Sequence, residues 1–348
     1  MKILLNCDVD WAWRMWGESP FLDELSKQHE PIIFCDKNIK TEYTKISLPA
    51  NLRKYHHKHD IPDDKKKDIL EFLKKILKEI DVVLLASAGE RFVNLELIKL
   101  CKELGKKSVF MVEGLNNADY GIPVWPDKIF VWGKVMRDLF IENVKNTGSC
   151  PPDILEITGQ PRFDNFYEIA RPRKAYKVVM VAPPFYSSSY AEETADLIMG
   201  GLRNFKTPDL LMVHPHPSIG TNLYRDTNKK YRKDGFYVSK GSLREFWQLA
   251  DVCVTSASTI AIEAMCFDIP VVIADKRGII KTQRHFRHLL KSGSYLYAQT
   301  HEDVENAVNW SLQNPQEKSK ERQKMVKDYF CAFDGKSSQR CVRAIKKL

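Results

Sequence analysis

Several features that define large protein classes are missing from this sequence. No run of about 18 apolar residues occurs, so the sequence predicts no helix that spans a membrane. The first residues, MKILLNCDVDW, hold one lysine and only three consecutive apolar residues, which is not the pattern of a secretion signal. The eight cysteines form no C-x-x-C pair. They are typical of reduced, mostly buried thiols, and we therefore expect a cytoplasmic protein.

Motifs of several common chemistries are absent as well. The sequence contains neither the P-loop pattern G-x-x-x-x-G-K-[ST] nor the dinucleotide pattern G-x-G-x-x-G, so neither type of nucleotide site is supported. The nucleophile elbow G-x-S-x-G is also missing.

The size and charge of the chain limit its organisation and its partners. A length of 348 residues with 43% hydrophobic content suggests two domains, each with its own core. The net charge of +9 is compatible with nucleic acid, an anionic membrane surface or an acidic substrate. Basic residues are spread along the chain and do not form one basic face with interleaved aromatics, so we expect no nucleic-acid partner.

Strand-like and helix-like patterns alternate along the chain. Strands are expected at 2–7, 31–36, 81–87, 107–113, 127–133 and 153–158, and again at 177–182, 209–214, 236–239, 252–255 and 271–274. Helices are expected at 65–80, 92–104, 134–146, 190–205, 243–250, 260–267, 302–313, 316–331 and 337–347. The alternation breaks between Gly159 and Tyr176. It predicts two Rossmann-like domains with parallel sheets and a cleft between them.

Two segments do not fit this alternation. Residues 11–16 contain three tryptophans, Trp11, Trp13 and Trp16, and are expected to form a loop. The tryptophan side chains either form a platform for an acceptor sugar or only pack the loop against the rest of the protein. Residues 40–64 are polar and expected to be irregular, and the histidines at 56, 57 and 59 are expected to be solvated.

A strand, a turn of small residues, a helix and a second strand follow one another between residues 251 and 274. The turn Ser256-Ala257-Ser258-Thr259 lies at the carboxyl end of one strand and the amino end of a helix. Free backbone amides and hydroxyls favour an anion there, which makes the turn a candidate phosphate site. Glu263, one turn into the helix, is a candidate for hydrogen bonds to a ribose. Ser and Thr are also ordinary helix caps, so the turn has a purely structural alternative.

Histidines follow another predicted strand. His214 comes directly after DLLMV, where ligands bind in open α/β sheets, and the flanking prolines restrict the backbone of HPHP. The imidazole is a candidate donor to a phosphate oxygen. His214 and His216 have two alternatives, a metal pair and a structural pair, and no matched Asp or Cys partner for a metal is found nearby.

Acidic residues end two strands of the first half. Asp8 and Asp10 form a D-x-D pattern after the first strand and are expected to line the cleft. Glu113 ends SVFMVE, where partial burial would raise its pKa and suit it to act as a general base. Its alternative is a surface carboxylate in a loop.

Four short segments occur in an order that resembles a known family. They are ITGQPRFD (157–164), HP (214–215), the Ser/Thr-rich stretch 251–264 and DGKSSQR (334–340). Together they resemble GT-B-fold transferases of bacterial surface-polymer synthesis, and above all the CDP-glycerol glycerophosphotransferases. Transferases that use CMP-activated Kdo or sialic acid share the HP and Ser/Thr segments, and UDP-GlcNAc 2-epimerases share the fold.

The resemblance implies specific site residues and boundaries. It implies that His214 and the turn bind the donor phosphates, that Glu263 binds the ribose, and that Arg162 of the G-x-P-R-x-D segment contacts the donor. The predicted donor-binding residues are therefore Arg162, His214, Ser256, Ser258, Thr259 and Glu263. Domains are expected at 1–160 and 161–330, with a last helix in 331–348 that returns to the first domain. This chain has Glu113-Gly114 where glycerophosphotransferases have His-Gly, and VEGL (112–115) is closer to the epimerase form.

The resulting prediction is a metal-independent GT-B glycosyltransferase without a cofactor. It would move a sugar or polyol phosphate from a CMP-, CDP- or UDP-linked donor to a surface glycan or lipid-linked acceptor. Catalytic candidates are Glu113 as base, Asp8, Asp10, and His214 on the departing phosphate. The positive charge would suit peripheral binding to the inner face of a membrane. The alternative is an epimerase that acts on a UDP-sugar without an acceptor.

Overall fold

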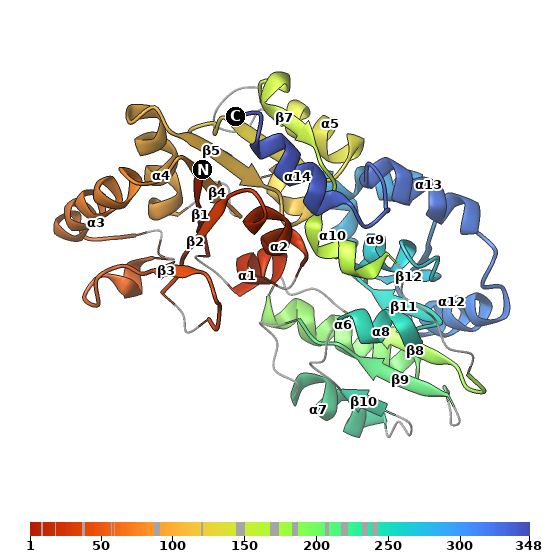
Figure 1. Cartoon of the computed structure of the whole chain (residues 1–348). Coiled ribbons are helices and arrows are strands. Elements are labelled where there is room, and N and C mark those ends of the chain that lie inside the picture. The colour runs from red at the N-terminus through yellow and green to blue at the C-terminus, as the bar shows by residue number, and fades with distance from the viewer. Residues whose placement is uncertain are drawn as a thin grey trace. The chain divides into compact units, whose positions relative to one another are not determined.

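Two compact units make up the chain, and each contains its own parallel sheet. In the computed structural model (Figure 1), unit 1 comprises Met1–Tyr167 and Asp328–Leu348, and unit 2 comprises Glu168–Lys327. The structure describes residues 1–7, 10–17, 19–36, 39–56, 58, 60–86, 91–119, 121–143, 150–167, 174–182, 187–205, 209–216, 222–231, 236–238 and 243–348; at positions 10, 11, 14 and 188 it describes the backbone alone.

The sheet of unit 1 is seven-stranded and parallel, in the order β3-β2-β1-β4-β5-β6-β7. Its strands are β1 (Lys2–Asn6), β2 (Glu30–Phe34), β3 (Thr44–Ile46), β4 (Val82–Leu85), β5 (Lys107–Met111), β6 (Lys128–Val131) and β7 (Leu155–Ile157). Its helices are α1 (Asp10–Trp16), α2 (Phe21–Ser26), α3 (Asp63–Leu77), α4 (Phe92–Glu103), α5 (Lys134–Glu142) and α14 (Ser337–Ile345), with single turns η1 (Arg53–Tyr55), η2 (Leu115–Asp119), η3 (Pro152–Ile154) and η4 (Pro161–Phe166).

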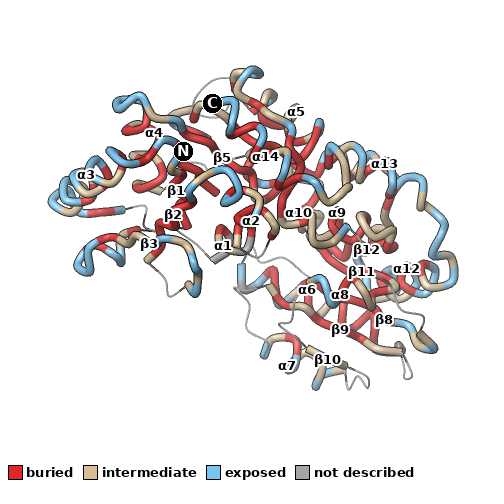
Figure 2. The backbone as a smooth tube through the Cα atoms, viewed as in Figure 1, coloured by how far each residue is buried: buried red, intermediate tan, exposed pale blue. Residues whose placement is uncertain are grey.

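Alternation along the strands divides the core of unit 1 between the two faces of its sheet. Ile3 and Leu5 pack with residues of α1, α2 and α14, whereas Leu4, between them, packs with residues of α3 and α4. Side chains of a strand alternate between faces, so consecutive apolar residues are needed when both faces are covered. The inner strands of both sheets are accordingly buried along most of their length, as Figure 2 shows, whereas the outer strands β3, β7, β10 and β13 are only partly buried.

The sheet of unit 2 is six-stranded and parallel, in the order β10-β9-β8-β11-β12-β13. Its strands are β8 (Val178–Val181), β9 (Leu210–Val213), β10 (Phe236–Val238), β11 (Val252–Thr255), β12 (Val271–Ala274) and β13 (Leu296–Ala298). Its helices are α6 (Ser188–Gly201), α7 (Asn222–Tyr231), α8 (Leu243–Leu249), α9 (Ile260–Met265), α10 (Ile279–Thr282), α11 (Arg287–Lys291) and α12 (His301–Gln313), with the turn η5 (Arg284–Phe286). Helix α13 (Ser319–Tyr329) carries the chain back to unit 1.

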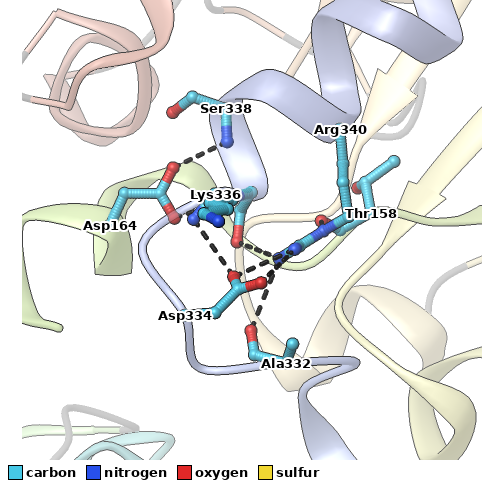
Figure 3. Close-up of polar contacts among 8 residues, drawn as sticks. Thr158, Asp164, Ala332, Asp334, Lys336, Ser338 and Arg340 are labelled. Atoms are coloured by element: carbon cyan, nitrogen blue, oxygen red, sulfur yellow. Dashed lines mark hydrogen bonds and ion pairs between the residues drawn. The ribbon is translucent and has the colours of Figure 1, made fainter.

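The last helix is held to unit 1 by two of the segments that carry the family resemblance (Figure 3). The carboxylate of Asp164 accepts hydrogen bonds from the backbone N–H groups of Ser337 (2.9 Å) and Ser338 (2.6 Å), in the first turn of α14. Arg340 donates to both carboxylate oxygens of Asp334 at 2.9 Å and to the carbonyl of Thr158 at 2.7 Å. These residues of G-x-P-R-x-D and DGKSSQR therefore have a structural role in this chain.

A glycine is required at the centre of this contact. Gly159 has φ +81°, and a Cβ added there would collide with the Ser337 hydroxyl. Both the backbone conformation and the close approach exclude larger residues at this position.

Three local predictions were wrong. The expected loop with three tryptophans is helix α1, and Trp16 is fully buried in the core. The segment 40–64 contains β3 and η1 and is not wholly irregular. His56 is 2% exposed and not solvated, while His57 and His59 lie outside the described residues. Within the described residues, no helix is long and apolar enough to cross a bilayer.

Candidate functional site

The turn between β11 and α9 lies at the switch point of the sheet of unit 2. From β8 the chain continues to β9 and β10 on one side, and β11, β12 and β13 lie on the other. The connections that follow β8 and β11 run in opposite directions along the sheet, which leaves room for a ligand at the carboxyl ends of these two strands. Open α/β sheets bind ligands at such points. Residues 256–259 follow β11 directly, so the predicted phosphate turn is at this point of the sheet.

The hydroxyls of the turn point to different surroundings. Ser258 and Thr259 are partly exposed, and the Ser258 hydroxyl accepts a weak hydrogen bond from the N–H of Ile260 at 3.3 Å. Thr259 precedes α9, and its side chain makes no capping hydrogen bond. Ser256 is fully buried, and its hydroxyl is hydrogen-bonded to Tyr190. The Ser256 side chain is therefore engaged with Tyr190, and its contact with a donor phosphate stays a prediction.

Glu263 lies on α9 and is buried, with 2% of its surface exposed. Burial, and in second place the charge of Glu263, raises the pKa of the Cys253 thiol in β11. The carboxylate therefore acts electrostatically on β11, beside the turn.

His214 follows β9, close to the turn. Its backbone N–H donates to the carbonyl of Val181 at 2.8 Å, which extends the strand pairing by one residue, and Pro215 is buried. The Phe246 ring of α8 packs edge-on against the imidazole with centroids 4.9 Å apart. Because β8 alone separates β9 from β11, the spacing of strands places the His214 backbone and the turn roughly 10 Å apart. A nucleoside diphosphate is long enough to bridge that span.

Glu113 follows β5 in unit 1 on a turn that side chains hold in place. The side-chain oxygen of Asn117 accepts hydrogen bonds from the N–H groups of Glu113 (3.0 Å) and Gly114 (2.7 Å). The carbonyl of Val112, one residue earlier, accepts from Gln160 at 2.8 Å and from the indole of Trp132 at 2.7 Å. The backbone before and after Glu113 is thereby fixed.

Arg162 lies beside Glu113. Their closest charged atoms are 3.5 Å apart, and both side chains are 23% exposed. The guanidinium is also 4.7 Å from the centroid of the Phe163 ring. The Glu113 carboxylate therefore lies within ion-pair distance of a cation in the same unit. Arg162 belongs to unit 1, whereas the predicted donor turn is in unit 2.

Two other predicted acids cannot be placed. Asp8 lies outside the described residues, and of Asp10 only the backbone at the start of α1 is described. Within the part of the chain that the structure describes, no three His, Cys, Asp or Glu side chains are grouped so that they could hold a metal ion.

The sequence analysis missed a buried polar group at the switch point of unit 1, between β1 and β4. His56 Nε2 lies 2.7 Å from the side-chain oxygen of Asn6, the last residue of β1, and His56 Nδ1 lies 2.7 Å from Asp36 Oδ2. Asn6 also donates to Asn94 of α4. A signal was present, since Asn6 ends β1 and Asp36 follows the adjacent strand β2 by two residues, but nothing local connects them to His56.

Comparison with known families agrees with this architecture. The chain is a two-unit α/β enzyme of the GT-B class, with a parallel sheet in each unit and candidate ligand-binding residues at strand ends. Residues 150–347, more than half of the chain, match the family model of CDP-glycerol:poly(glycerophosphate) glycerophosphotransferases. The chain therefore belongs to this family, and it is a transferase that uses a nucleotide-activated donor. Among curated protein sequences, none matches the chain significantly.

Solved structures with the same fold cover almost the entire chain. A putative UDP-N-acetylglucosamine 2-epimerase from Listeria monocytogenes has a TM-score of 0.72 at 12% identity, covering 99% of this chain and 96% of its own. The wall teichoic acid polymerase TagF has a TM-score of 0.67 at 10% identity, covering 100% and 88%. The UDP-GlcNAc 2-epimerase of Neisseria meningitidis, bound to UDP-GlcNAc, also has a TM-score of 0.67, at 12% identity and full coverage of both chains.

Proposed function

We propose that this protein transfers a polyol phosphate, with glycerol phosphate as the first candidate, from a CDP-linked donor to an acceptor hydroxyl. The family supports the donor class, and one observation supports the site: His214 follows β9 and the 256–259 turn follows β11, the two strands that flank β8 beside the switch point of the sheet. The unit that carries them, Glu168–Lys327, lies entirely within the matched range 150–347.

The reaction is a phosphoryl transfer with one bond formed and one broken. The acceptor oxygen attacks the phosphorus that carries the polyol, the pyrophosphate P–O bond breaks, and CMP leaves as a phosphodiester forms. Glu113, held by Asn117 and beside Arg162, takes the proton of the acceptor hydroxyl. His214, Ser258 and Thr259 donate hydrogen bonds to the donor phosphates and stabilise the charge on the departing CMP.

The test is CMP release from CDP-glycerol in the presence of a glycerol-phosphate-primed acceptor. His214→Ala and Ser258→Ala should each lower kcat by about 10²–10³, the usual cost of losing one donor to a developing charge. Glu113→Gln should lower kcat by about 10²–10⁴ and leave donor binding unchanged. Thr227→Ala is the matched control, because that hydroxyl donates to the carbonyl of Leu223 at 2.8 Å within α7 itself. Wild-type rates in both the His214 and Ser258 variants would contradict the assignment.

A second candidate is a UDP-sugar 2-epimerase. It is favoured by Glu113-Gly114, which stands where glycerophosphotransferases have His-Gly and which is closer to the epimerase form. An epimerase needs no acceptor. Incubation of the protein with UDP-GlcNAc alone distinguishes the two, because only an epimerase would change the configuration at C2 or release UDP.

The acceptor is proposed to be linked to lipid in an anionic membrane. The net charge of +9 supports this, since basic residues near an anionic surface each contribute roughly 1 kcal/mol to binding. Flotation with vesicles containing anionic lipid should carry the protein upward at low salt and less so at high salt. Equal flotation with neutral vesicles would contradict the idea.

A further inference from the structure

A buried group of hydroxyls and one carboxylate lies under the candidate donor turn. Tyr190 of α6 is 3% exposed, and Ser256 and Asp275 are fully buried. The hydroxyl of Tyr190 is hydrogen-bonded to that of Ser256 and lies 3.4 Å from Asp275 Oδ1. Ser256 follows β11 and Asp275 follows β12, so Tyr190 links the carboxyl ends of two adjacent strands.

Hydrogen bonds of Ser187 and of Asp275 hold the surroundings of Tyr190 in position. On α6, the backbone N–H of Tyr190 donates to the capping hydroxyl of Ser187 at 3.2 Å. On the other side, the Asp275 carboxylate accepts from the N–H groups of Ile279 (3.0 Å) and Ile280 (2.9 Å), at the start of α10. The tyrosine hydroxyl is therefore fixed from its own helix and from the segment after β12.

The protonation state of Tyr190 defines the direction of this network. Burial raises the pKa of Tyr190 to about 12, so the hydroxyl keeps its proton at neutral pH. A carboxylate only accepts hydrogen bonds, so the one proton of Tyr190 goes to one acceptor among Asp275, Ser256 and Thr194. The hydroxyl of Ser256, which is fully buried, is in each case in contact with Tyr190.

We propose that Tyr190 is a positioning residue for the donor: its hydrogen bond to Ser256 fixes the 256–259 turn so that Ser258 and Thr259 face the donor phosphates. This inference rests on the proposed function, because it requires the turn to bind phosphate. It assigns to Ser256 the role of connecting the turn to Tyr190. It also makes donor affinity depend on a residue that does not touch the donor.

The experiment measures CDP affinity by calorimetry, together with the melting temperature of the unliganded protein. Tyr190→Phe and Ser256→Ala remove the contact from its two sides, and each should weaken CDP binding by about three- to tenfold, the usual value for one lost hydrogen bond. The double variant should bind CDP about as strongly as whichever single variant binds it less tightly, because the two single substitutions remove the same hydrogen bond. Tyr231→Phe is the control, since its hydroxyl donates to Asp196 at 2.7 Å in the same unit, away from the turn.

The outcomes separate this inference from the function on which it rests. If the wild type binds CDP, Ser258→Ala weakens that binding, and Tyr190→Phe and Ser256→Ala bind like the Tyr231→Phe control, the positioning role is overturned and the proposed function stands. If the wild type binds neither CDP nor CMP, both are overturned. If Tyr190→Phe fails to fold, Ser256→Ala decides alone. A fall in CDP affinity at an unchanged melting temperature supports the positioning role, because a merely structural residue would change the melting temperature first.

Discussion

Replacement of Asp164 by asparagine should selectively loosen the last helix. The two oxygens of Asp164 accept the N–H groups of Ser337 and Ser338, which begin α14. Asparagine keeps one acceptor, loses the charge that favours a helix amino terminus, and turns an amide NH2 toward a backbone N–H. A hydrogen bond to a charged group contributes about 1.5–3 kcal/mol, so the free energy for opening α14 should fall by about that amount.

Native-state hydrogen exchange measures this opening directly. A loss of 1.5–3 kcal/mol accelerates amide exchange in residues 337–345 by about tenfold to a hundredfold if the helix opens as a unit. The control is Asp138→Asn on α5, because the Asp138 side chain is 44% exposed and lies 4.0 Å from Arg137, its neighbour in the same helix. The reasoning is refuted if exchange in 337–345 changes less than threefold, or if β1 and β4 accelerate to the same extent, since that would mean global destabilisation.

Two further predictions concern buried titratable groups. His56→Ala leaves Asp36, whose side chain is 10% exposed, without its imidazole neighbour and opens a cavity. It should lower the unfolding free energy of unit 1 by about 2–4 kcal/mol in urea. Lys58→Ala, at an exposed neighbouring position, is the control, and a loss below about 0.5 kcal/mol would contradict the prediction. Burial raises the pKa of Tyr190 to about 12, from about 10 for free tyrosine. The contribution of the neutral Tyr190 side chain to the free energy of unfolding is therefore complete below pH 10 and is lost as the pH rises through 12. Tyr190→Phe should therefore lose less thermal stability than wild type between pH 10 and 12; equal losses would speak against it.

Much of the fold was predictable because strands buried on both faces are encoded locally. Runs such as ILL in β1, VVLL and VVIA are continuously apolar, and each belongs to an inner strand of a parallel sheet. The helical spacing in 65–80 also marked α3. Short elements were missed, among them α7, α10 and α11, because a few polar turns of helix stabilised by tertiary contacts leave no clear periodicity.

The contacts of the site residues were not predictable, because they join distant parts of the chain. His56 reaches Asn6 across 50 positions, and Tyr190 reaches Ser256 across 66. The sequence located the turn at 256–259, but the direction of each hydroxyl depends on which residue fills the space below it. Arg162 shows the same limit, since its neighbour Glu113 is 49 positions away (162 minus 113) and a motif alone cannot identify that partner.

The path of the backbone has a consequence for synthesis. The chain leaves unit 1 after Tyr167 and re-enters it at Asp328, so all of unit 2 emerges from the ribosome before unit 1 is complete. Until then the apolar residues of α2 lack Cys341, Val342 and Ile345, which belong to the same core. Nascent domains ordinarily mature in the order in which they are translated. Here the second unit can finish first, and a ribosome stalled before codon 328 would hold a finished unit 2 beside a first unit with an open hydrophobic face.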